Sequence, residues 1–175
     1  MRHSLLAAAV GLVLASLSTA SAITIKKEAV PVKSAVVNLA PDFVIPGAGP
    51  KPRSLRSLKG QAVVILFAKS IKTKDLNTQV KRLQPLYEQF ASKEALFVVA
   101  LKEGDALIHS NIPFAVAANG PEVCAAYGVQ KDFSIGIVGK DGNLDYLTTK
   151  ILPPERVHDV IQNSFAVQAS LRRNP

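Results

Sequence analysis

The strongest constraint on the fold is an unbroken apolar run in the first half of the chain. Val63 to Ala68 are six consecutive apolar residues, rich in Val, Ile, Leu and Phe, and they follow a turn at Gly60. A short run of this kind, without alternation of polar residues, is typical of a strand that is buried on both faces of a sheet. The sequence therefore predicts a central strand with covering elements on each side.

The segments after this strand predict a parallel crossover. From about Asp75 to Ser92, apolar residues recur at steps of three and four, which indicates an amphipathic helix. Pro85 lies within this helix and can kink it. Ala95 to Leu101 is a second apolar strand. A strand, a helix and a strand in this order favour a right-handed parallel connection.

The remaining segments predict a hairpin and a closing helix. Asp141-Gly142 is a strong hairpin signal between two apolar runs. The expected elements are a short apolar segment at 114–117, a short helix at 121–127, strands at 134–138 and 144–147, and a final helix from 153. This order indicates an α/β fold with a central mixed sheet flanked by helices.

The first residues predict an export signal. A short basic start precedes an apolar run and the small-x-small sequence Ala20-Ser21-Ala22. The apolar run has about thirteen residues, fewer than the roughly 20 that a membrane-spanning helix needs. We therefore expect residues 1–22 to be a cleaved signal peptide. The mature chain is then expected to have no transmembrane span and to be periplasmic or secreted.

The rest of the chain divides by composition into three parts. Residues 23–39 mix Lys, Glu and Pro with small apolar residues, which favours an extended arm or linker. Regular patterns run through residues 40–168, which we interpret as one domain, and residues 169–175 form a basic C-terminal tail.

The charge balance favours anionic partners. The chain has 21 Lys and Arg against 13 Asp and Glu, a formal net charge of +8 at pH 7, and such a charge attracts anions. It has neither zinc-finger spacing nor a basic stripe with interleaved aromatic residues, so nucleic acid is not expected. His109 and His158, the histidines outside the signal, lack metal-ligand spacing. We expect an unknown protein or an anionic envelope component as partner, and neither a metal nor a cofactor.

Several motifs in order carry a family resemblance. Residues 40–43 read Ala-Pro-Asp-Phe, residues 49–67 contain a Leu-x-x-Leu-Lys-Gly entry into the central strand, and residues 122–129 end in Tyr-Gly-Val. This order resembles redoxins and peroxiredoxins of the alkyl hydroperoxide reductase and thiol-specific antioxidant type, over roughly residues 40–165. The resemblance implies a thioredoxin-like fold. The Phe-Ala-x-Ser start and the Gly-Lys-Asp-Gly hairpin also resemble an uncharacterised bacterial domain family that lacks the cysteine pair.

The departures from the redoxin pattern concern its reactive site. The family places its reactive cysteines just after the central strand, where Lys72 and Asp75 stand in this chain. The cis-proline that faces those thiols is expected near residues 131–134, which read Lys-Asp-Phe-Ser. The resemblance therefore implies a redoxin scaffold without the usual thiol–disulfide chemistry.

A basic loop after the central strand is the expected contact surface. Its candidate binding residues are Lys69, Ser70, Lys72, Thr73, Lys74 and Asp75. The carboxyl ends of parallel strands are where open α/β sheets bind ligands, and the amides of a helix N-terminus add to an anion site. The alternative is a solvated basic face, in which Asp75 serves only as the N-cap of the helix.

Cys124 is the single cysteine and the remaining candidate for catalysis. An exposed, acidic thiol there would make the protein a one-cysteine antioxidant or thiol oxidoreductase. A free cysteine also packs well as a small buried hydrophobe, which is the interpretation we favour. We thus predict a non-catalytic binding or scaffold protein of the cell envelope, with the one-cysteine enzyme and a basic polyanion-binding module as alternatives.

Overall fold

The computed structural model describes residues 38–46, 51–90, 95–104 and 108–164. The predicted signal peptide, nearly all of the predicted arm and the predicted basic tail lie outside the described residues. No helix in this part of the chain is long and apolar enough to cross a membrane. In chain order the elements are β1 (Val44–Ile45), β2 (Arg53–Ser54), the 3-10 helix η1 (Leu55–Leu58), β3 (Ala62–Ala68), α1 (Lys74–Phe90), β4 (Ala95–Leu101), β5 (Ala115–Val116), α2 (Gly120–Ala126), β6 (Phe133–Val138), β7 (Leu144–Thr148) and α3 (Pro154–Gln162).

Within the described residues, five strands form the main sheet in the order β5-β4-β3-β6-β7. The central strand β3 is parallel to β4, with Ile65 opposite Val98, and antiparallel to β6, with Ile65 opposite Gly136. A separate antiparallel pair joins β1 to β2. The predicted parallel crossover, the predicted hairpin and the mixed sheet flanked by helices are confirmed.

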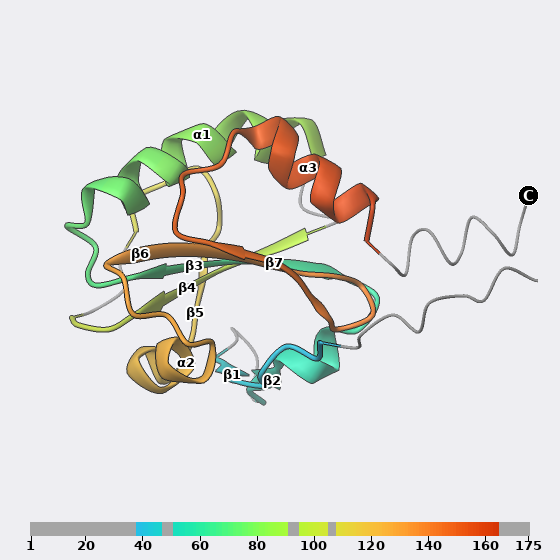
Figure 1. Ribbon diagram of the computed structural model, residues 1–175, viewed down its shortest axis with the longest axis horizontal. Coiled ribbons are helices and arrows are strands. Elements are labelled where there is room, and N and C mark those ends of the chain that lie inside the picture. Colours follow the sequence, from blue (N-terminus) through green and yellow to red (C-terminus); the bar gives the residue numbers. More distant parts are fainter. Residues whose placement is uncertain (1–37, 47–50, 91–94, 105–107, 165–175) are drawn as a thin grey trace, which may run out of the picture. The chain divides into compact units, whose positions relative to one another are not determined.

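Side chains of β3 alternate between two buried clusters, one on each face of the sheet. Val64 and Leu66 pack in a cluster with residues of α1 and α3, such as Leu83. Ile65 and Phe67 pack in the other cluster, with residues of η1 and α2. Figure 1 shows α1 and α3 on one face of the sheet and α2 with the β1–β2 pair on the other. All seven residues of β3 are buried, which explains why its sequence shows no polar alternation.

The two predicted helices that flank the candidate sites start one residue earlier than their patterns indicated. Helix α1 runs over Lys74–Phe90, so Asp75 lies inside its first turn, and the interpretation of Asp75 as the N-cap is wrong. Helix α2 begins at Gly120, next to Pro121, rather than at the proline itself. Gly120 packs against the backbone of Leu101 so closely that a Cβ there would collide with the Leu101 carbonyl.

Candidate functional site

The basic loop, residues 69–75, follows β3 directly. Its first residue, Lys69, is hydrogen-bonded to two other segments of the chain. The Lys69 N–H donates to the Asp132 carbonyl over 2.8 Å, and the Lys69 carbonyl accepts from the Glu103 N–H over 2.8 Å. Glu103 follows β4, and Asp132 directly precedes β6. The loop therefore lies where the carboxyl ends of β3 and β4 meet the segment before β6, as the topology of a parallel crossover requires.

The hydroxyl groups of the basic loop shape the loop itself. The Ser70 N–H donates to Thr73 Oγ1 over 3.2 Å, and the Lys72 N–H donates to Ser70 Oγ over 3.3 Å. The Thr73 N–H donates to the Ser70 carbonyl over 3.0 Å, which closes a turn just before α1. The side-chain amide of Asn77 donates to the Ile71 carbonyl over 3.1 Å and so ties the loop to the helix. Most of the loop backbone is thus held by local hydrogen bonds.

The lysines of the basic loop point their charges to solvent. Lys69 Nζ lies 3.9 Å from Glu103 Oε1, but both side chains are more than half exposed, and such a pair contributes at most about 1 kcal/mol. Lys72 and Lys74 are exposed and have no ion-pair partner among the described residues. The loop therefore offers a cationic surface on a backbone of defined shape.

Lys102 is a residue beside the candidate site whose role the sequence patterns did not indicate. It follows β4, and its Nζ donates to the carbonyls of Gln130 and Lys131, each over 3.0 Å. Lys131 belongs to the segment where the family resemblance places a cis-proline, and Gln130 directly precedes that segment; the described residues contain no cis peptide bond. A lysine side chain thus holds this segment against the end of β4. No local sequence signal could show it, because the partners are 28 and 29 residues apart.

Cys124 lies in α2, away from the cluster that α1 covers. Its side chain is 1% exposed, and it belongs to the buried cluster on the α2 face of the sheet. Its Sγ contacts the Ala100 carbonyl at 3.8 Å, an acceptor that cannot remove a proton as a general base. Burial raises the pKa of the Cys124 thiol, and the charge of Lys102 offsets part of this rise. The thiol is therefore protonated and shielded at neutral pH.

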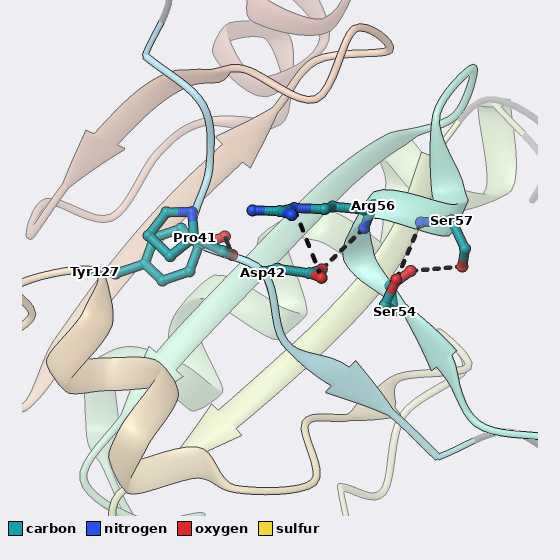
Figure 2. Close-up of polar contacts among 6 residues, drawn as sticks. All are labelled: Pro41, Asp42, Ser54, Arg56, Ser57 and Tyr127. Carbon is teal, nitrogen blue, oxygen red and sulfur yellow. Dashed lines mark hydrogen bonds and ion pairs between the residues drawn. The ribbon is translucent and has the colours of Figure 1, made fainter.

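Two of the family-like motifs, at residues 40–43 and 122–129, contact each other on the α2 side of the sheet. Figure 2 shows the Tyr127 ring beside Pro41, whose carbonyl accepts from the Tyr127 hydroxyl over 3.0 Å. Asp42 accepts from the Arg56 N–H over 3.0 Å and pairs with the Arg56 guanidinium over 3.7 Å. Burial, assisted by the charge of Asp42, raises the pKa of Tyr127. These contacts hold the segment before β1 against η1 and the C-terminal end of α2.

A pocket of about 490 Å³ adjoins the basic loop on the α1 side of the domain. We call it the α1 pocket. Sequence reasoning missed it, because residues from the loop, from α1 and from the segment after β4 meet there only in the folded chain. Its lining residues are Ile71, Asn77, Val80, Lys81, Gln84, Ile108 and His109.

Comparisons with known proteins agree with the fold. A model of the AhpC/TSA family matches residues 36–147. A thiol:disulfide interchange protein of the thioredoxin family from Chlorobium tepidum is 16% identical, with a TM-score of 0.56 over 72% of this chain and 94% of that one. The bacterioferritin comigratory protein of Xanthomonas campestris is 18% identical, with a TM-score of 0.53 over 81% of this chain and 98% of that one.

A third similar structure is the exposed lipoprotein thioredoxin of Streptococcus pneumoniae. It is 19% identical, with a TM-score of 0.52 over 68% of this chain and 96% of that one. A search of curated proteins gave no match. At these identities the likenesses concern the fold, which is thioredoxin-like.

Proposed function

Because the chain belongs to the AhpC/TSA family but has no cysteine at the carboxyl end of β3, we propose that it acts by binding a partner rather than by thiol chemistry. Two features together carry this proposal: the basic loop is cationic and fixed by hydrogen bonds, and the Cys124 thiol is buried. The contact surface is the basic loop, and the protein is a non-catalytic binding or scaffold protein of the cell envelope.

The loss of thiol chemistry follows from what such chemistry needs. Peroxide reduction and disulfide exchange both require a thiolate that a substrate can reach. Cys124 is 1% exposed, and burial raises its pKa, so neither requirement is met in the folded protein. These facts argue against the one-cysteine enzyme.

The location in the envelope rests on the N-terminal sequence. Its basic start, apolar run and small residues at 20–22 have the pattern of a cleaved export signal. The net charge of +8 and the exposed Lys72 and Lys74 favour a partner with negative charge, either a protein or another anionic envelope component.

Site-directed photo-cross-linking tests the contact surface. The photoreactive amino acid benzoylphenylalanine is placed at Lys72 and, as a matched control, at the exposed Lys59, which precedes β3 at its other end. Both variants are irradiated in an envelope extract of the source organism. We expect a discrete adduct from position 72 and none from position 59. Equal labelling at both positions, or no adduct at position 72, contradicts the proposal.

A peroxide assay tests the absence of catalysis. The purified protein is mixed with hydrogen peroxide and dithiothreitol, and peroxide consumption is followed beside the Cys124→Ser variant. We expect both proteins to consume peroxide no faster than the buffer. Turnover by the native chain that disappears in Cys124→Ser would overturn the proposal and restore the one-cysteine enzyme.

A further inference from the structure

The α1 pocket has an aliphatic interior. Val80 is 5% exposed, Ile71 is 37% exposed, and Ile108 is half-buried. These three side chains come from three different segments, namely α1, the basic loop and the segment after β4. The volume of about 490 Å³ lies in the range of ligand pockets, roughly 300–1,000 Å³. The pocket can therefore take an aliphatic side chain and part of the backbone that carries it.

The rim of the α1 pocket carries a positive charge at Lys81. Lys81 and His109 line it, and no carboxylate is among its described lining residues. Lys74 lies seven residues before Lys81, on the same side of α1, because residues seven apart are two helical turns apart. Lys72 is exposed on the adjoining loop. A ligand that reaches from the pocket to the loop thus meets several positive charges in succession.

Amide side chains in the same pocket favour a peptide ligand over a small inorganic anion. Gln84 lines it with a side-chain amide, which can both donate to and accept from a peptide group. Asn77 lines it too, and its side-chain NH₂ group donates to the carbonyls of Ile71 (3.1 Å) and Thr73 (3.3 Å), so Gln84 is the better placed of the two amides to donate to a peptide. Aliphatic, amide and cationic groups together match an extended acidic segment with an aliphatic anchor.

We propose that the α1 pocket and the basic loop bind an acidic segment of a partner protein, which inserts an aliphatic side chain between its carboxylates. This inference rests on the proposed function and names the class of partner for the same surface. The aliphatic anchor fills the space beside Val80, while the carboxylates lie along Lys81, Lys74 and Lys72.

Fluorescence anisotropy with defined peptides tests the inference. The probe is the fluorescein-labelled pentapeptide Glu-Asp-Leu-Asp-Glu, compared with a version in which Ser replaces Leu and with Lys-Lys-Leu-Lys-Lys. We expect Lys81→Glu to weaken binding of the first peptide about tenfold, because it replaces an attraction to the peptide carboxylates by a repulsion. We expect Ile71→Ser to weaken it about fivefold, because it removes an apolar contact. The Lys59→Glu variant, remote from the pocket, should stay within about twofold.

The decisive readout is the coupling between protein and peptide changes. If the peptide Leu occupies the pocket, Ile71→Ser weakens the Leu peptide but has little further effect on the Ser peptide. Equal losses for both peptides, equal binding of the lysine peptide, or no binding of the acidic peptide at millimolar concentration would overturn the inference. Ile71 and Lys81 are exposed, so circular dichroism melting curves of their variants should match the native chain.

The cross-linking experiment separates this inference from the proposed function. A position-72 adduct that Lys81→Glu and Ile71→Ser leave unchanged refutes the acidic segment in the pocket, while binding through the loop stands. Absence of the position-72 adduct refutes both.

Discussion

Asp145 in β7 is a carboxylate that the fold holds at an energetic cost, so removing its charge should stabilise the protein. Its Oδ2 lies against Gly139, close to the Asp141 carboxylate. This oxygen is buried and has no hydrogen-bond partner among the described residues. Burial and, secondly, the charge of Asp141 raise the pKa of Asp145 to about 6 from its ordinary 3.8. The change we consider is Asp145→Asn, which keeps the shape and removes the charge.

The rise in the pKa of Asp145 sets the size of the expected effect. A tenfold change in an ionisation equilibrium corresponds to about 1.36 kcal/mol, so the rise bounds the destabilisation at about 3 kcal/mol. The side chain is partly exposed, and solvent screening reduces this bound to about 1–1.5 kcal/mol. The pKa of Asp145 is higher in the folded than in the unfolded chain, so ionisation of this carboxyl group destabilises the folded state. This destabilisation is absent below about pH 4, grows as the pH rises, and is complete above about pH 6.

Urea unfolding followed by circular dichroism at pH 4, 5, 6, 7 and 8 measures this effect. We expect Asp145→Asn to raise the free energy of unfolding by about 1–1.5 kcal/mol at pH 7 and 8, and to leave it unchanged near pH 4. The exposed Asp132→Asn serves as the matched control, and it should show no such pH-dependent gain. A variant less stable than the native chain at pH 7, or a gain that persists undiminished at pH 4, would refute the reasoning.

Three further predictions concern the core and the cysteine. Gln79→Ala should lower the free energy of unfolding by about 3 kcal/mol in urea titrations. The Gln79 side chain is fully buried; its oxygen accepts from the Leu152 N–H over 2.7 Å, and its NH₂ group donates to the Leu152 carbonyl over 3.0 Å. Gly120→Ala should cost about 3 kcal/mol in the same assay, since the added Cβ meets the Leu101 carbonyl. In the folded protein Cys124 should react with iodoacetamide far more slowly than in denaturant between about pH 5 and 9, as mass spectrometry can measure.

The elements that the sequence pattern predicted well are those whose environment is uniform along their length. β3 and β4 could be predicted because strands covered on both faces need apolar residues at nearly every position. α1 could be predicted from its spacing, since one face packs on the sheet. Its start was less predictable. The turn between Ser70 and Thr73 ends directly before Lys74, so α1 begins at Lys74. The acidic Asp75, which the sequence offered as an N-cap, lies inside the helix.

The parts of the fold and of the site that could not be predicted depend on contacts between distant residues. Lys102 reaches the carbonyls of Gln130 and Lys131 only because β4 ends beside the segment that enters β6. Gln79 meets Leu152 across 73 residues for a similar reason. Single-sequence patterns report periodicity and local turns, whereas these contacts depend on which strands are neighbours. The basic loop itself could be located from the sequence, because it follows the central strand directly.

The way the basic loop is held connects the missing thiol to the proposed binding role. A loop that becomes ordered only on binding loses conformational entropy at that step, and this loss weakens the complex. Here the Ser70 and Thr73 hydroxyls and the Asn77 amide already fix the turn in the free protein. Loss of these bonds should therefore weaken partner binding while the lysine charges remain. The defined shape of the basic loop in the free protein therefore supports the proposed binding role.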